Sequence, residues 1–155
     1  MKSKNYEIDN IDKKILDILT KNAKKPYTEV AKKVFVSGGT VHVRMKKMED
    51  MGLVKNTTLQ LDFSKLGYDI TAFIGIFLEK SAMYDQVIEQ LKLIPEITNL
   101  HYTTGNYSIF AKIMCKDTDH LKDILYDKIQ KIEGISRTDT MISLEESLDR
   151  NLQLE

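Results

Sequence analysis

The first fifty-six residues carry apolar side chains at helical spacing. Ile11, Ile15, Ile18 and Leu19 recur at positions i, i+4, i+7 and i+8, which places all four on one face of a helix. Asp9 stands directly ahead of this run, where its carboxylate can accept hydrogen bonds from the free N–H groups of a first helical turn. The pattern therefore predicts an amphipathic helix that Asp9 caps.

Two further helices follow, separated by a short break. Residues Thr28–Val34 form the second predicted helix, and residues 35–37 interrupt the pattern. Ser37 is the expected N-cap of a third helix, Gly38–Met51, which Gly52 closes. Two helices joined by a three-residue turn form a helix-turn-helix, and the extended residues after Gly52 are suited to supply a wing. We therefore predict a winged helix-turn-helix.

The second helix of such a motif lies in the major groove of DNA, with its N-terminal half at the base edges. Val41, Met45 and Met48 form the predicted buried stripe of this helix, so the opposite positions are expected to face DNA. The cations among these positions can neutralise phosphates, and the other side chains can contact bases or a thymine methyl group. The candidate DNA-binding residues are Ser37, Gly38, Gly39, Thr40, His42, Val43, Arg44, Lys46 and Lys47.

A pair of glycines, Gly38 and Gly39, opens the recognition helix. Each glycine in a helix costs roughly 0.5–1 kcal/mol relative to alanine. Two explanations stay open: the backbone N–H groups approach a phosphate closely, or the first turn is frayed.

The rest of the chain alternates between strand and helix patterns. Gly75 lies within an apolar, β-branched run and indicates a bulge or a close contact, and Gly105-Asn106 indicates a tight hairpin. The predicted elements are strand 71–79, helix 84–91, strand 97–104, strand 107–115, a helical stripe over 121–132 and strand 135–144. This β-α-β-β-α-β order predicts a ferredoxin-like domain, which makes the whole chain α+β. Because the small sheet leaves one face and its edges uncovered, we expect a homodimer.

Charge divides the chain in the same way as the patterns do. Residues 1–56 hold twelve lysines and one arginine against seven acidic residues, a net charge of +6, and residues 57–155 carry −6. A basic module indicates double-stranded DNA or another nucleic acid as partner, although small helical domains are also lysine-rich for solubility. The single cysteine, Cys115, forms no internal disulfide and is expected in the core, which favours a cytoplasmic protein. No apolar run is long enough to span a membrane.

No catalytic or metal-binding pattern stands out. The three histidines, His42, His101 and His120, are scattered, and no nucleophile, phosphate-loop or zinc motif surrounds them. Acidic residues between 117 and 127 lie along one predicted helix, where a solvated face is the expected explanation rather than a metal site. We therefore expect that the protein binds no metal and no cofactor and that it is not an enzyme.

Taken together, the motifs resemble the Lrp/AsnC (feast/famine) family of transcription regulators. The resemblance covers nearly the whole chain in the correct order. It rests on Ile8-Asp9-x-x-Asp12-x-x-Ile15-Leu16, Val30-Ala31-Lys32-Lys33-Val34-x-Val36-Ser37, Thr40-Val41-x-x-Arg44-Met45-x-x-Met48-Glu49-x-x-Gly52-Leu53-Val54, Leu66-Gly67, Ile94-Pro95-Glu96-Ile97, Thr104-Gly105-x-Tyr107 and Gly134-Ile135-x-x-Thr138-x-Thr140.

This resemblance implies a division of labour along the chain. Residues 1–56 would form the winged helix-turn-helix, 57–70 the extended wing and linker, and 71–155 a RAM-type ferredoxin-like domain for effector binding and oligomerisation. Members of the family dimerise through their sheets, often assemble into octamers, and often bind an amino acid or a related small metabolite that alters assembly or DNA affinity.

The resemblance also assigns an effector site. A loop would hold the charged backbone groups of the effector, and two threonines on the last strand would line the same cleft. The candidate effector-binding residues are Thr104, Gly105, Asn106, Tyr107, Ser108, Thr138 and Thr140. Ser108 replaces the aspartate that ends the family's G-x-Y-D motif, so this site lacks a negative charge that the family provides.

Two alternatives to a sequence-specific regulator remain at this point. One is a chromosome-organising protein that coats DNA without sequence preference. The other is an enzyme resembling the sirohaem decarboxylases, which share this architecture; the acidic second domain and the basic recognition helix argue against it.

Overall fold

The computed structural model describes residues 7–154 and divides them into two compact units. The helical unit comprises the described residues up to Gln60 together with the segment that starts at Leu148, and the sheet unit is Leu61–Ser147. The terminal segment, expected to belong with the sheet, therefore packs with the helices. No helix among residues 7–154 is long and apolar enough to cross a membrane.

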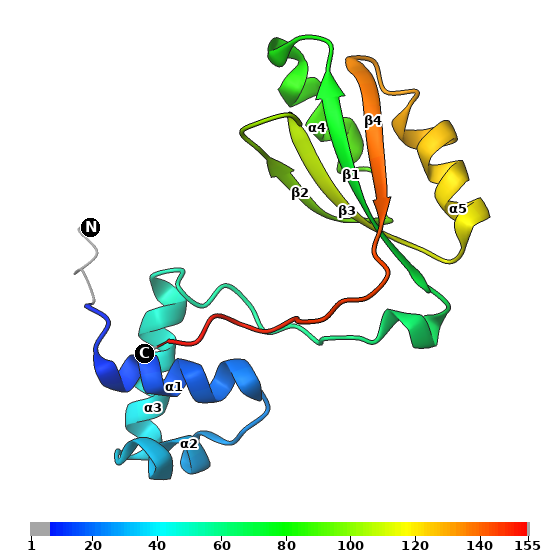
Figure 1. The fold of residues 1–155 in the computed structure, drawn as a ribbon. Helices are drawn as coiled ribbons and strands as arrows, with labels where there is room; N and C mark the ends of the chain where they lie inside the picture. Colours follow the sequence, from blue (N-terminus) through cyan, green and yellow to red (C-terminus); the bar gives the residue numbers. More distant parts are fainter. Residues whose placement is uncertain (1–6, 155) are drawn as a thin grey trace. The chain divides into compact units, whose positions relative to one another are not determined.

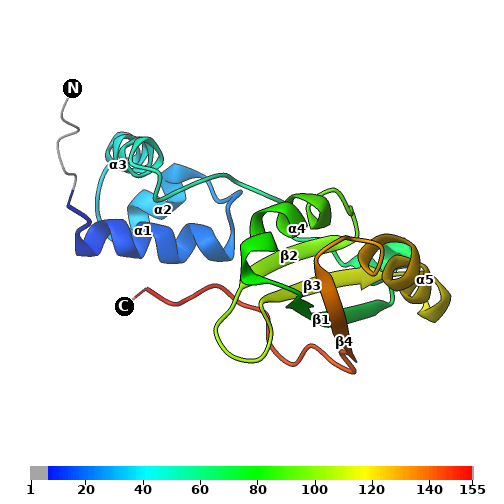
Figure 2. The ribbon, with the colours of Figure 1, turned by 90° about the horizontal axis from the view of Figure 1, so that it is seen from above.

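Three helices build the first unit: α1 (Asn10–Lys21), α2 (Tyr27–Val34) and α3 (Gly38–Asp50) (Figures 1 and 2). The predicted stripes form its core, with Leu16 added and with Ile11 and Ile18 at its edge. The buried residues are Ile15, Leu16, Leu19, Val30, Ala31, Val34, Val41, Met45 and Met48. The structure thus confirms the helix-turn-helix that the periodicity predicted.

The turn between α2 and α3 has an unusual backbone. Phe35 ends α2 with φ 58° and ψ 46°, the left-handed conformation, and is the only residue other than glycine with a positive φ in the described chain. Its side chain is 94% exposed, whereas the next residue, Val36, packs against the helical core.

The terminal segment after residue 147 lies along the helical unit. The side-chain amide of Asn151 donates to the carbonyl of Thr20 in α1, 3.1 Å away, and Leu154 packs against the helical core. Gln60 in the linker donates to Asp149 at 2.9 Å, so the two extended chains run side by side there (Figure 1). The linker residues 54–62 form no strand with other described residues.

The second unit is a four-stranded antiparallel sheet with strand order β2-β3-β1-β4 (Figure 1). The sheet and its helices follow the predicted β-α-β-β-α-β order, which confirms the ferredoxin-like topology. Its elements are β1 (Ile70–Leu78), α4 (Tyr84–Leu91), β2 (Ile97–Tyr102), β3 (Ile109–Cys115), α5 (Thr118–Asp123) and β4 (Ile135–Ile142).

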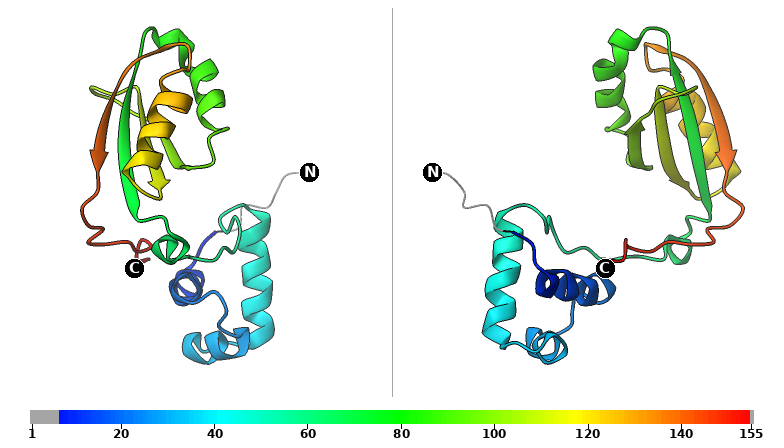
Figure 3. Two further views of the ribbon diagram at one scale, coloured as in Figure 1. Left: turned by 90° about the vertical axis from the view of Figure 1, so that its right-hand side faces the viewer. Right: turned by 60° about the vertical axis from the view of Figure 1, so that its left-hand side comes forward.

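Both helices of this unit cover the same face of the sheet (Figure 3). Alternate residues of β1 and β3 point into the core beneath them: Ala72, Ile74 and Ile76, and Ile109, Ala111, Ile113 and Cys115. The other face, which we call the open face, carries Phe73, Phe77 and Phe110. Phe73 and Phe110 stack with ring centroids 5.7 Å apart.

The last helix departs from the predicted regular stripe. α5 continues into a π-helical turn, Ile124–Ile129, in which the N–H of Gln130 donates to the carbonyl of Leu125. Ile124 and Ile129, both fully buried, are five residues apart, and a π turn brings residues at that spacing onto one face.

Candidate DNA interface and effector loop

The first turn of α3 is regular and capped. The Ser37 hydroxyl accepts a hydrogen bond from the backbone N–H of Thr40 at 3.1 Å and lies 2.9 Å from the Thr40 hydroxyl. Gly38 faces α2, since a Cβ there would lie 3.5 Å from Cγ2 of Thr28, while Gly39 faces solvent with only Ser37 near it. The turn is therefore ordered rather than frayed.

The outward side of α3 presents most of the predicted DNA-binding residues. His42, Val43, Lys46 and Lys47 are exposed, and Thr40 is half-buried. The imidazole of His42 leans toward the Tyr27 ring of α2, with ring centroids 6.1 Å apart. A shallow groove runs along this side and is lined by Asp9, Ser37, Gly39, Thr40, Val43, Arg44 and Lys47. The groove and the exposed lysines form the candidate DNA interface.

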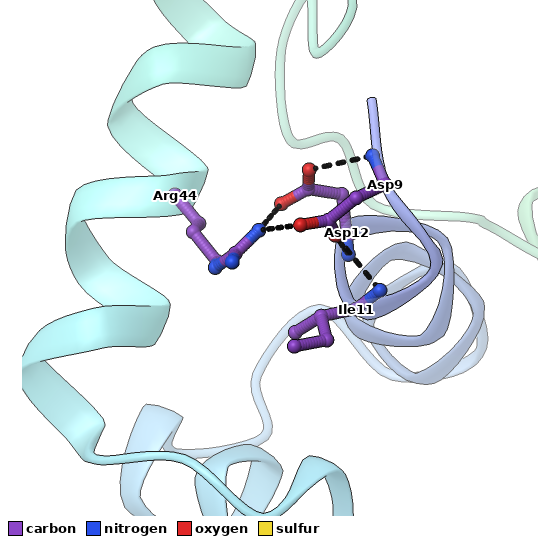
Figure 4. A network of polar contacts seen from close by, with 4 residues as sticks. All are labelled: Asp9, Ile11, Asp12 and Arg44. Carbon is purple, nitrogen blue, oxygen red and sulfur yellow. Dashed lines mark hydrogen bonds and ion pairs between the residues drawn. The ribbon is translucent and has the colours of Figure 1, made fainter. Parts of the chain in front are cut away.

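Arg44 has a second set of partners that its place in the sequence does not reveal (Figure 4). One guanidinium nitrogen, Nη1, lies 2.8 Å from a carboxylate oxygen of Asp9 and 2.9 Å from one of Asp12. The Asp12 side chain is fully buried, and the Arg44 side chain is 22% exposed. Arg44 therefore ties α3 to the start of α1, and its contact with DNA stays a prediction.

The two carboxylates also cap α1. Asp9 accepts from the N–H groups of Ile11 and Asp12, and Asp12 accepts from the N–H of Asp9, which completes a reciprocal capping box. The backbone hydrogen bond from Asp12, followed by the hydrogen bond from Arg44, lowers the pKa of Asp9 from its ordinary value. One cation and two helix-capping acids thus form a single network.

The loop between β2 and β3 holds most of the candidate effector-binding residues, and we call it the effector loop for that reason. It differs from the tight hairpin that Gly105-Asn106 predicted. It spans residues 103–108 and closes through the N–H of Thr103, which donates to the carbonyl of Ser108 at 3.2 Å. The Thr103 hydroxyl donates to the carbonyl of Tyr107 at 2.8 Å. Gly105 has a φ of 100°, which favours glycine, and Thr104, Gly105 and Asn106 are exposed at the tip or near it. The loop is longer than the predicted two-residue turn because Tyr107 and Ser108, which were expected to begin the next strand, belong to the loop; β3 begins only at Ile109.

Tyr107 turns back from the loop and lies on the open face of the sheet. The N–H of Ser108 donates to the carbonyl of Ile76 at 2.9 Å, which docks the loop on β1. The Tyr107 ring covers Gly75 so closely that a Cβ at residue 75 would overlap it. It also meets Phe77 edge-on, with ring centroids 5.2 Å apart. The close contact expected at Gly75 is therefore with the effector loop.

Thr138 and Thr140 lie on the opposite face of the sheet from Tyr107. The register pairs them with Ile76 and Ile74 of β1, whose side chains point toward the helices, and directly paired antiparallel residues share a face. Within one chain the structure does not bring these threonine side chains together with Tyr107. The backbone of the loop does reach Ile76, the partner of Thr138.

The thiol of Cys115 and the carboxylate of Asp117 contribute to the fold itself. Cys115 is fully buried in the core, as expected, and burial raises the pKa of its thiol to about 11. Asp117 accepts from the backbone N–H of His120 and caps α5. No group of three or more His, Cys, Asp or Glu side chains within residues 7–154 is placed to hold a metal ion.

Both units match known protein families. Residues 8–55 match the model for a winged helix-turn-helix DNA-binding domain, and residues 71–152 match the model for the Lrp/AsnC ligand-binding domain. The first match lies within the helical unit, and the second covers the sheet unit from β1 onward together with part of the terminal segment.

Relatives align along almost the whole chain. The chain is 45% identical over 148 residues to the regulatory protein AsnC of Haemophilus influenzae, and 42% identical over 149 residues to that of Escherichia coli K12. The alignments cover 96% of this chain in both cases, and 99% and 98% of the relatives. An HTH-type transcriptional regulator of Pyrococcus furiosus, FL11, is 39% identical over 137 residues, which cover 88% of this chain and 89% of that one.

Solved structures share the fold. The structure of E. coli AsnC superposes with a TM-score of 0.91 at 40% identity, covering 96% of this chain and 99% of the other. A transcriptional regulator of Neisseria meningitidis in complex with L-methionine superposes with a TM-score of 0.89, covering 93% and 94%. Its identity of 20% shows a shared fold alone.

The relatives are named as regulatory proteins and transcriptional regulators, which confirms the expectation of a regulator rather than an enzyme. An N-terminal DNA-binding unit with a basic, capped recognition helix is joined to a C-terminal ligand-binding unit of the matching fold. The chain belongs to the Lrp/AsnC family of transcriptional regulators.

Proposed function

We propose that this regulator binds specific DNA sequences through the exposed side of α3, and that an amino acid or a related small metabolite modulates its DNA affinity or its assembly. The observation that carries the DNA part is the capped, regular α3 with Val43, Lys46 and Lys47 exposed beside one groove. A helix of this kind offers cations for phosphates and small apolar and hydroxyl groups for base edges. Its place of action would be the cytoplasm.

A homodimer is the proposed DNA-binding form. The open face holds the stacked pair Phe73 and Phe110, the Tyr107 ring and Phe77, over which the Arg137 guanidinium lies at 3.9 Å. An aromatic sheet face of this kind is suited to pack against the same face of a second copy. Two α3 helices related by a two-fold axis would then read half-sites about one helical turn apart, and dimers would assemble further, to octamers.

Reversal of two charges tests the DNA interface. Lys46→Glu combined with Lys47→Glu is expected to weaken binding to all DNA sequences and to lower the slope of log affinity against log salt by about 2, because two phosphate contacts are lost. The measurement is fluorescence anisotropy with a duplex selected by the wild-type protein from a random library. The matched control is Lys122→Glu with Lys131→Glu, on exposed positions of the sheet unit. An unchanged affinity would remove Lys46 and Lys47 from the interface.

The effector part of the proposal rests on the loop and on β4. The exposed N–H groups of the loop around Gly105 and Asn106 are suited to a carboxylate, and Thr138 and Thr140 would line the same cleft once a second dimer completes it. The methionine complex of the Neisseria regulator, which shares the fold, supports an amino acid as the ligand class. Ser108 offers a hydroxyl but no charge for the amino group of such a ligand.

Titration with amino acids tests this site. A mixture of the twenty amino acids at millimolar concentration is expected to shift the DNA affinity or the sedimentation of the wild-type protein severalfold. Gly105→Ala strains a backbone that has a φ of 100°, and should abolish that response while leaving ligand-free DNA binding intact. Gly67→Ala introduces the same kind of backbone strain, at a φ of 81°, outside both the loop and α3, and is the control that should keep the response. If Gly105→Ala responds like the wild type, the loop is not the effector site.

A further inference from the structure

The backbone conformation of Phe35 is energetically unfavourable for a residue of this type and so destabilises the helical unit. Phe35 holds a left-handed backbone with φ 58°, which a bulky side chain adopts unfavourably and which glycine or asparagine adopts readily. Its ring is 94% exposed and so contributes no burial, and no ring contact to it is formed within the described chain. The helical unit alone therefore gives no reason for a phenylalanine at this position.

The position of Phe35 is next to the candidate DNA interface. It lies two residues before Ser37, the N-cap of α3, in the turn that leads into the recognition helix. Val36 packs inward against the helical core, while the Phe35 ring is directed to solvent. The half-buried Val36 and the capped helix hold the backbone of the turn from both sides, which keeps Phe35 near the N-terminal end of α3. In helix-turn-helix proteins this end of the recognition helix approaches the base edges.

We propose that Phe35 is a DNA contact that reads thymine, by packing its ring against a thymine methyl group at the edge of the half-site. This inference rests on the proposed DNA-binding function and adds a residue to it. Phenylalanine is one of the side chains that recognise the thymine methyl group in the major groove. On DNA the ring would be removed from water. The favourable free energy of that burial is the stabilisation that the exposed ring does not provide in the free protein.

Substitution of Phe35 separates a role in DNA binding from a role in folding. Phe35→Gly and Phe35→Asn both tolerate the left-handed backbone, so the free protein should be as stable as the wild type or more stable in thermal unfolding. Their affinity for the selected duplex should nevertheless fall about tenfold, with an unchanged salt slope because no charge is lost. Phe35→Tyr should retain most of the affinity. Leu93→Asn, at a 74% exposed position in the sheet unit, should bind as the wild type does.

Uracil in place of thymine tests the atom that is read. Replacing each thymine of the duplex in turn removes only the methyl group, and one such replacement should weaken the wild-type protein severalfold but leave Phe35→Gly unaffected. The inference would be overturned if the uracil replacement weakened Phe35→Gly as much as the wild-type protein, or if Phe35→Gly bound the duplex with wild-type affinity. A changed sedimentation of free Phe35→Gly with normal DNA affinity would also overturn it, in favour of a contact between copies. If the wild-type protein selects no duplex, the proposed function itself fails, which is distinguishable from failure of Phe35 alone.

Discussion

Replacing Arg44 with methionine is expected to destabilise the helical unit by about 3 kcal/mol, because it takes the Arg44 cation away from the fully buried Asp12 carboxylate. Breaking a buried ion pair from one side is among the most damaging single changes, and a loss of this size is a large part of the stability of a typical domain. The measurement is amide hydrogen exchange in α1 and α3 of the full chain, with urea unfolding followed by circular dichroism. Lys46→Met removes an exposed cation from the same helix and should change stability by no more than about 0.5 kcal/mol.

A second substitution identifies the cause of that loss. Asp12→Asn combined with Arg44→Met removes the buried charge as well as its partner, while the amide oxygen can still accept from the N–H of Asp9. The double variant should therefore be more stable than Arg44→Met alone. If the two losses simply add, the buried charge is not the reason.

Acid should act on the same network. Because the pKa of Asp9 is lower in the folded chain than its ordinary value of 3.8, the stabilisation that it provides is present above that pH and is lost as the pH falls through the lowered pKa. In Arg44→Met two causes of this lowered pKa are gone, the hydrogen bond from Arg44 and its charge. The helical unit of this variant should consequently show a weaker dependence of stability on pH below about 4.

Gly75→Ala is expected to destabilise the sheet unit by about 1–3 kcal/mol and to displace the effector loop. The added Cβ would overlap the Tyr107 ring, lying 2.7 Å from its Cγ, and this part of the ring is close to the backbone and has little freedom to move aside. The ring would have to leave its contact with Phe77, and the docked Ser108 would follow. Amide exchange in β1 and β3 measures the loss, and the near-ultraviolet circular dichroism of the tyrosines reports the displaced ring.

Two controls make this prediction specific. Gly39→Ala adds the same methyl group in ordinary contact distance of Ser37 on a helix, and should stabilise that helix by about 0.5–1 kcal/mol. Tyr107→Ala removes the obstructing ring, so the cost of Gly75→Ala should shrink in that background. A cost that is equal with and without the ring would show that the overlap is not responsible.

Periodicity predicted most of the fold, since helical and strand spacings report directly on which side chains are buried. Neighbouring residues in the sequence are enough to predict the buried stripe of Val41, Met45 and Met48 and the Ser37 cap. They also predict the order in which strands and helices follow one another along the chain. The network at Arg44 does not, because it joins residues 32 and 35 positions apart. At the level of the sequence Arg44 is indistinguishable from the lysines beside it, and only the packing of α1 on α3 gives it carboxylate partners.

The effector loop shows the same limit. Gly105-Asn106 correctly marks a turn, but local preference alone favours the shortest hairpin. The loop is longer because Ser108 bonds to β1 and Tyr107 covers Gly75, a residue 32 positions earlier whose missing side chain was the one available signal. The position of the terminal segment could not be predicted from the sequence, because the packing of one residue, Leu154, on the helical core leaves no periodic pattern.

The docked terminal segment has a consequence for the order in which a newly made chain can fold. Residues 7–60 leave the ribosome first, yet Leu154 and Asn151, which complete the packing around α1, are synthesised only after every strand of the sheet unit. The helical unit of a nascent chain therefore reaches its final form after the sheet unit has been translated. A chain interrupted during synthesis would carry all three helices, but not the finished surface around them.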